Sequence, residues 1–132
     1  MPGCILRASG ENFEVDSFLA ASTLRPYAVH RRGEVSRKAE PFTNSGIKVD
    51  VSKAGKEFAE NIADAIGFLE EHEKELERLR AFAGISDIRL DFGVFLQEAV
   101  ARFYYLPPEL VSRAGELGIG IELSCYAVSE DE

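Results

Sequence analysis

Few residues in this sequence have the types and spacing that catalysis requires. It contains no His-Glu-x-x-His zinc motif, no Cys-x-x-Cys pair, no phosphate-binding P-loop and no Gly-x-Ser-x-Gly nucleophile elbow. Its only histidines, His30 and His72, fall on different predicted elements, and neither has an acid arranged beside it. We therefore predict no catalytic residue, no metal ligand and no cofactor, and the sequence favours a protein that is not an enzyme.

The cysteines give no sign of redox or metal chemistry. Cys4 and Cys125 both have the inward parity of their predicted strands, so we expect them to behave as small buried apolar side chains with free thiols. Free thiols, together with the lack of a secretory signal at the N-terminus, predict a cytoplasmic protein.

The residues that could bind a ligand lie on the opposite, outward parity of the predicted strands. This parity collects Arg7, His30, Arg32, Lys48, Asp50, Arg89, Asp91, Arg102, Tyr104, Glu122 and Tyr126. Arginine and tyrosine are enriched in protein interfaces, so one hypothesis is a flat recognition surface. Its candidate binding residues are His30, Arg32, Arg89, Arg102, Tyr104 and Tyr126. The alternative is an ordinary solvent face, because cross-strand pairs of arginines with acids produce the same pattern.

The charge limits which partners are plausible. A net charge of −8 disfavours nucleic acid and anionic membranes, and no apolar run is long enough to span a bilayer. A basic protein partner suits this charge. Residues 25–38, however, carry five basic side chains and a single acid, Glu34. A competing hypothesis is therefore a small-molecule domain or enzyme that holds an anion with this segment.

Hydrophobic periodicity predicts the elements that must position these residues. Alternating apolar residues indicate six strands, at residues 4–8, 27–34, 47–52, 88–93, 100–106 and 119–125. Helices are expected at residues 15–22, 56–83 and 108–117. A loop is expected at residues 35–45, and a hairpin turn at residues 97–98.

The segment 56–83 has the pattern of one long amphipathic helix. Ser52 is its expected N-cap and Gly84 its expected C-terminal glycine. Ile66 and Leu69 lie at the centre of the apolar stripe. The glutamates that follow read as a solvated face, so replacing Glu71 or Glu75 by Gln is expected to change little.

The order of elements is then βαββαββαβ, and its last six elements match the ferredoxin-like order. We predict a single domain, residues 1–132, with an α+β fold. The expected architecture is a two-layer sandwich whose mixed, mostly antiparallel sheet of about six strands carries helices on one face.

Several local patterns carry a resemblance over nearly the whole chain. They are Ala8-Ser9-Gly10, Leu24-Arg25-Pro26, Arg32-Gly33-Glu34, Leu106-Pro107-Pro108-Glu109-Leu110, Glu116-Leu117-Gly118-Ile119 and Cys125-Tyr126. With these patterns the chain resembles a widespread, uncharacterised bacterial domain family of unknown function. Its size and acidity are also similar in style to those of bacterial immunity proteins. The leading hypothesis is a non-enzymatic protein-binding module, such as an immunity or inhibitor protein, of open oligomeric state.

Overall fold

The sheet is the framework of the molecule. The computed structural model describes residues 3–96 and 101–127, which form five strands and four helices. The strands are β1 (Cys4–Gly10), β2 (Ala28–His30), β3 (Ser45–Ser52), β4 (Asp87–Leu96) and β5 (Gly120–Ala127). Their order across the sheet is β2-β3-β1-β4-β5, with only the β4–β5 pair parallel. The mixed, mostly antiparallel α+β class predicted from the sequence is confirmed.

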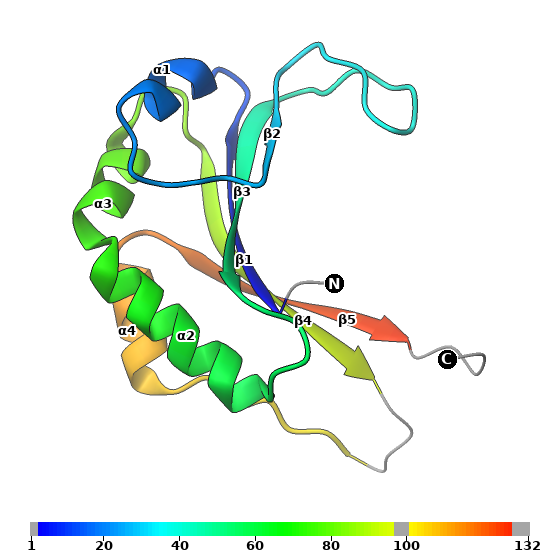
Figure 1. Ribbon diagram of the computed structural model, residues 1–132, viewed down its shortest axis with the longest axis vertical. Helices are drawn as coiled ribbons and strands as arrows, with labels where there is room; N and C mark the ends of the chain where they lie inside the picture. The colour runs from blue at the N-terminus through cyan, green and yellow to red at the C-terminus, as the bar shows by residue number, and fades with distance from the viewer. Residues whose placement is uncertain (1–2, 97–100, 128–132) are drawn as a thin grey trace.

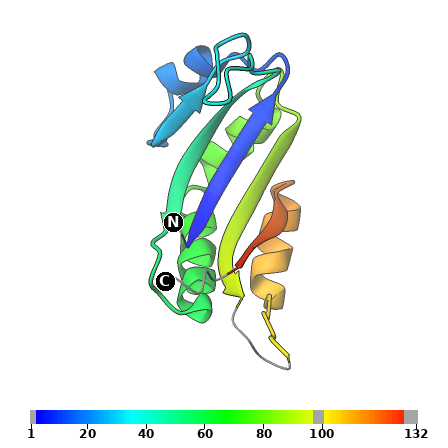
Figure 2. The ribbon, with the colours of Figure 1, turned by 90° about the vertical axis from the view of Figure 1, so that its right-hand side faces the viewer.

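All four helices cover one face of this sheet. They are α1 (Val15–Ala20), α2 (Phe58–Glu71), α3 (Glu73–Ala81) and α4 (Pro108–Glu116). Figure 1 shows them in a single layer, and Figure 2 views the sheet from the opposite side, with the helices behind the strands. The buried side chains of all four helices join those of the sheet in one apolar cluster, where Leu6, Phe18, Leu69 and Leu90 are among the most enclosed. The other face of the sheet is left open by the helices.

The strand predicted at residues 100–106 is not formed in its described part. Residues 101–106 adopt no strand, and the expected turn at residues 97–98 lies outside the described residues. One aromatic residue of this segment, Tyr104, packs instead of pairing, and its ring contacts Phe58 of α2 at a centroid separation of 5.1 Å. The ferredoxin-like order expected for the second half is therefore not realised, and β1 inserts between β3 and β4.

The long helix predicted at residues 56–83 is two helices that meet at His72. The break interrupts regular helical geometry, yet the apolar stripe continues across it, because Leu69, Leu76 and Leu79 are all buried. Figure 1 shows the chain bending between α2 and α3. The side chain of Glu75 ties α3 to the segment after α1, a long-range contact that helical periodicity cannot reveal.

The predicted N-cap is also wrong, and so is the predicted C-terminal glycine, because α3 ends at Ala81 with Phe82 as its C-cap. Ser52 stays in β3, where a bulge turns it to the helix side, and its hydroxyl donates to Asp64 Oδ2 at 2.7 Å. Glu57 occupies the N-cap position without a side-chain bond. Gly84 has a φ of +90°, and a Cβ atom there would collide with the Asn12 carbonyl, so only glycine fits.

The second predicted strand is shorter than expected. β2 ends at His30, because Gly33 with a φ of +90° turns the chain back on itself. Residues 33–42 then form a small hairpin-like excursion, with backbone bonds from Gly33 N to the Phe42 carbonyl and from Phe42 N to the Glu34 carbonyl. This excursion, most of which falls in the loop predicted at residues 35–45, projects on the open side of the sheet, away from the helices (Figure 1).

Candidate binding site on the open face of the sheet

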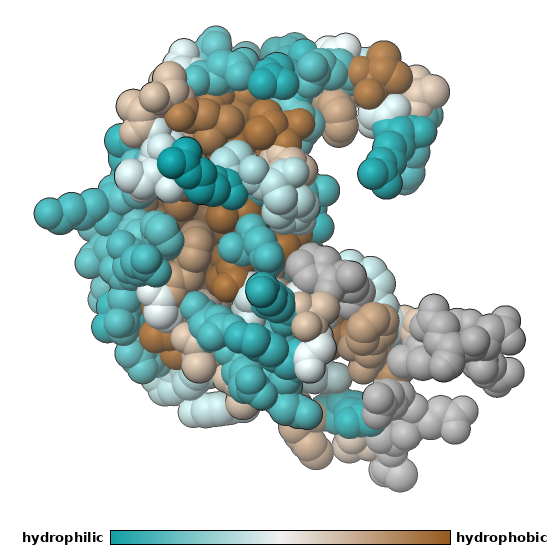
Figure 3. Space-filling model, in the orientation of Figure 1, coloured by the Kyte–Doolittle hydropathy of each residue, from teal (hydrophilic) through white to brown (hydrophobic). Residues whose placement is uncertain are grey.

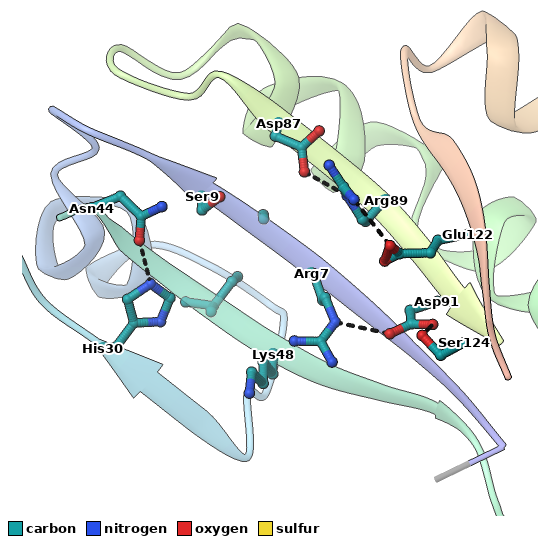
Figure 4. Close-up of a pocket in the computed structure, with 12 residues that line it drawn as sticks. Arg7, Ser9, His30, Asn44, Lys48, Asp87, Arg89, Asp91, Glu122 and Ser124 are labelled. Atoms are coloured by element: carbon teal, nitrogen blue, oxygen red, sulfur yellow. Dashed lines mark hydrogen bonds and ion pairs between the residues drawn. The ribbon is translucent and has the colours of Figure 1, made fainter. Parts of the chain in front are cut away.

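A shallow hollow of about 370 Å³ lies on the open face of the sheet. Its lining comes from β1, β3, β4 and β5, together with His30 of β2 and Asn44 just before β3. Figure 3 shows the molecular surface indented on this side, between the 33–42 excursion and the far ends of β4 and β5. Charged and polar side chains dominate the lining, as Figure 4 shows.

Strand register places three cations in a row across the floor of the hollow. Arg7 of β1 lies directly opposite Lys48 of β3 and, on its other side, directly opposite Arg89 of β4. We call Lys48, Arg7 and Arg89 the cationic row. Ala28 and Gly120 flank it on the edge strands, so small residues leave both ends uncovered. Like charges directly opposite one another destabilise a sheet, so this arrangement costs folding free energy unless anions compensate it.

Arg89 is fully compensated. Its Nε donates to Asp87 Oδ2 at 2.7 Å and its Nη1 donates to Glu122 Oε2 at 3.2 Å. The hydrogen bond that Arg89 donates to Asp87, followed by the charge of Asp87, raises the pKa of the Arg89 guanidinium further above its ordinary value. Arg89 thus links β4 to β5 and has little capacity left for a ligand.

Arg7 has one carboxylate partner, which bonds its Nε atom. Its Nε donates to Asp91 Oδ2 at 3.0 Å, while Asp91 Oδ1 accepts a 2.6 Å bond from the Ser124 hydroxyl. Asp91 is only 6% exposed, and these two bonds explain how a buried carboxylate is tolerated. The terminal nitrogens of Arg7 make no hydrogen bond or ion pair within the described residues, and the side chain is 37% exposed.

Lys48 is the least compensated of the three, because Asp91 acts on it through its charge alone and without direct contact. Within residues 3–96 and 101–127 its ammonium forms no hydrogen bond or ion pair. Partial burial, and then the positive charges of Arg7 and Arg37, lower the pKa of Lys48. The number of directly bonded carboxylates therefore falls along the cationic row, from two at Arg89 to one at Arg7 and none at Lys48.

His30 forms the wall of the hollow beside Lys48, and its ring is held on three sides. Its Nε2 lies 2.8 Å from Asn44 Oδ1, and its ring is 4.7 Å from the ring of Phe42. Below it lies Gly46, where a Cβ atom would come within 2.7 Å of the imidazole. Glycine at this position of β3 lets the ring lie against the strand.

The six residues chosen from the sequence do not form one site. His30 and Arg89 lie in the hollow. Arg32 lies beyond the end of β2, with its guanidinium 3.5 Å from Glu11 and 3.3 Å from Asn12. Tyr126 lies at the end of β5, 43% exposed, with its ring 6.2 Å from that of Phe95.

Arg102 and Tyr104 line a separate depression near the start of α2. Its other lining residues include Gly3, Lys56, Phe58, Asn61 and Gly93. Their expected outward position assumed the strand at residues 100–106, which is absent from the described part of that segment. The sequence analysis missed Asn44, Asp87 and Ser124, and it did not select Arg7 or Lys48 from the outward parity. Strand register decides which outward-facing residues lie in the hollow, and a single sequence does not show strand register.

The basic segment 25–38 does not gather into one cluster. Arg31 bonds Asp16 through two nitrogens, at 3.0 and 2.8 Å, and Arg32 is near Glu11. Arg37 does not line the hollow, although its positive charge contributes to lowering the pKa of Lys48. The basic charge at the hollow therefore comes mainly from outside this segment.

One of the two thiols is not where the sequence placed it. Cys4 is buried, and desolvation, followed by the charge of Asp91, raises its pKa. Cys125 is exposed, although it lies directly opposite the buried Val94 in the β4–β5 pair. The reason is that the end of β5 runs beyond the helix layer (Figure 1). In the described part of the chain, no three His, Cys, Asp or Glu side chains gather as they would around a metal ion. No helix among those residues is long and apolar enough to cross a bilayer.

Fold and face together define a class of small α+β domain: a mixed sheet with helices on one side and a charged, hollowed face on the other. The chain belongs to the family described as Domain of unknown function (DUF4279), whose model matches residues 2–128. The predicted membership of an uncharacterised domain family is thereby confirmed. No curated protein and no solved structure matches the chain significantly.

Proposed function

We propose that this protein is a non-enzymatic binding module that recognises a protein partner through the open face of its sheet. In its specific form, the proposal is a bacterial immunity or inhibitor protein that acts in the cytoplasm. The observation that carries the proposal is the open face itself: all four helices of the described residues lie on the other side, and the face contains a formed hollow.

The architecture of this face suits recognition. The charged side chains that β1, β4 and β5 place on this face are held by bonds to one another, so little of their side-chain entropy is lost when a partner binds. Tyr126 and Phe95, 43% and 50% exposed, stand together at one end of the face and can serve as desolvated anchors. A net charge of −8 favours a partner with a basic surface, since long-range attraction speeds the encounter.

The acidic flank at the junction of α2 and α3 is the weaker candidate for the contact surface. Its most enclosed glutamate, Glu75, is engaged with Ser22, Thr23 and Arg78 within the protein. The exposed glutamates around it have no aromatic anchor beside them in the depression that they line. We assign them to steering a basic partner, which affects association more than dissociation.

The test compares three immobilised proteins: wild type, a face variant and a helix-side control. The face variant is Lys48→Ala with Tyr126→Ala, and the control is Glu71→Ala with Lys74→Ala. Proteins from the source cell that wild type and control retain are identified, purified and measured for binding kinetics. We expect the face variant to raise the dissociation rate at least about tenfold, as loss of anchor residues does. Equal dissociation rates for a purified partner on wild type and face variant would refute the use of this face.

A partner that is an enzyme or a toxin gives the sharper form of the test. An inhibitor or immunity protein in excess abolishes the partner's activity, and the face variant needs a higher concentration to do so. A partner that binds tightly through the open face but keeps its full activity would contradict the inhibitor role and leave the binding role intact.

A further inference from the structure

We propose that the hollow contains a carboxylate-binding site formed by Lys48 and the terminal nitrogens of Arg7, with His30 as its wall. The ligand would occupy the face that we propose for the protein partner, so the inference deepens the proposed function. It rests on that function only for the source of the carboxylate. A carboxylate can come from the side chain or chain end of a protein partner, or from a free small acid.

The first argument is the unequal compensation of the cationic row. Arg89 has two carboxylates, Arg7 has one on its Nε, and Lys48 has none. Across the row, like charges stand directly opposite one another, an arrangement that destabilises a sheet. Departures from such local rules are expected where a surface serves function. An anion between Lys48 and Arg7 would relieve this repulsion.

The second argument is geometry. Figure 4 shows the Arg7 guanidinium between Asp91 and Lys48, with Lys48 on the side of His30. Asp91 fixes the guanidinium plane through Nε, so the two terminal nitrogens are held toward the hollow. Two parallel N–H donors match the two oxygens of a carboxylate, and a lysine ammonium adds a donor without a fixed direction.

The third argument is how His30 is positioned. Its ring is clamped by Asn44, by Phe42 and by the close approach over Gly46. The imidazole therefore bounds the site at a fixed place beside Lys48 and leaves the hollow open above the strands. A Cβ atom at position 46 would collide with the Ala8 carbonyl as well as with the ring, so glycine is what allows this close approach.

The number of donors at the site selects among oxyanions. Asp87, Asp91 and Glu122 line the opposite side of the same hollow and offer acceptors, not donors (Figure 4). Among the described residues that line the hollow, Lys48 and the terminal nitrogens of Arg7 are the cationic donors without a hydrogen bond. They match the two oxygens of a carboxylate, whereas a phosphate presents more oxygens than these groups can bind. We therefore assign the site to carboxylate in preference to phosphate.

The experiment titrates the whole protein with sodium acetate, inorganic phosphate and sodium chloride at equal ionic strength. Amide and arginine Nε resonances are followed by NMR at Arg7, Gly46 and Lys48. We expect saturable shifts with acetate and only small, linear shifts with chloride. Acetate shifts no larger than those of chloride would overturn the site, and phosphate binding as tight as acetate would overturn the assignment to carboxylate.

Two matched lysine variants test which cation binds. Lys48→Met removes the ammonium but keeps the stem, and Lys74→Met does the same on the helix side of the molecule. We expect Lys48→Met to weaken acetate binding about fivefold, as loss of a partly exposed ion pair does, and Lys74→Met to leave it unchanged. Lys48→Arg should retain binding, which guards against misfolding as the explanation. Equal acetate affinity of Lys48→Met and wild type would overturn the inference.

A final comparison identifies the source of the carboxylate. An N-acetylated trialanine with a free C-terminus is titrated against the same peptide with an amidated end. Tighter binding of the free peptide than of acetate points to a protein chain end, and equal binding of the two points to a small acid. Each result supports a carboxylate site, whereas equal binding of the free and amidated peptides would contradict it. Because no partner protein is needed, failure here is distinct from failure of the proposed function.

Discussion

Replacing Glu75 by Gln should destabilise the protein, contrary to what its place in a run of glutamates predicts. The Glu75 side chain is only 12% exposed. Its carboxylate accepts bonds from the Ser22 hydroxyl at 2.5 Å, the Thr23 amide at 2.9 Å and Arg78 Nε at 2.7 Å. It therefore holds α3 to the segment that follows α1.

The magnitude follows from the pKa of Glu75. The bond from Arg78 is the largest contribution, and it outweighs the opposing effect of burial, so the pKa falls from 4.5 to about 2. A shift of this size corresponds to about 3 kcal/mol of stabilisation at neutral pH. A glutamine carbonyl can still accept one or two of the bonds but loses the charge-assisted contact with Arg78. We therefore expect Glu75→Gln to cost about 2 kcal/mol.

The pH dependence has a definite sign. Because the folded pKa is depressed, the stabilisation is fully present above the unfolded pKa of about 4.5 and is lost as pH falls toward 2. The difference between wild type and Glu75→Gln should therefore fall to about half near pH 3. A glutamine does not titrate, so the variant itself lacks this component of acid sensitivity.

Urea unfolding at pH 7 and at pH 3, followed by circular dichroism, measures this difference. Glu71→Gln is the matched control, since Glu71 is four positions away and 77% exposed; its expected change is within about 0.5 kcal/mol. The reasoning is refuted if both variants unfold at the wild-type urea concentration at pH 7. A loss for Glu75→Gln that persists undiminished at pH 3 would contradict the electrostatic origin.

Three further predictions concern the core and the thiols. Asn61→Ala should cost about 1–3 kcal/mol in urea melts, because the buried Asn61 amide donates to Ser52 Oγ at 2.8 Å and to the Lys53 carbonyl at 3.2 Å; a neutral result would show that this network does not anchor α2. Leu69→Ala should lower the free energy of unfolding by about 2–5 kcal/mol and Ile66→Ala by clearly less, since Leu69 is 1% exposed and Ile66 only partly buried. The reverse ranking would mean that α2 is rotated about its axis. In the native protein one thiol, that of Cys125, should react promptly with a disulfide reagent while Cys4 reacts only after unfolding; prompt reaction of two thiols would disprove the burial of Cys4.

Period-two alternation was sufficient to assign the faces of the central strands. Arg7, Lys48 and Arg89 all point outward as their parity predicts, and Leu6, Val49 and Leu90 all point into the core. This works because side chains alternate strictly along a strand and only one face is covered by helices. The same reasoning identified the α+β class.

Local patterns failed wherever a distant contact decided the outcome. The alternation at residues 100–106 resembles a strand, yet Tyr104 packs against α2. Helical periodicity runs unbroken through His72, yet the chain bends there and Glu75 bonds residues more than fifty positions away. Cys125 has inward parity, but the edge strand that carries it extends past the helices.

The amino-acid sequence by itself determined which side chains the open face could present, because parity depends only on neighbours along one strand. Tertiary structure alone decided which of them meet. Arg7 stands between Lys48 and Arg89 only because β1 inserts between β3 and β4 in one particular register. Strand order and register depend on the packing of the whole core, a sum over many long-range contacts that no short stretch of sequence contains.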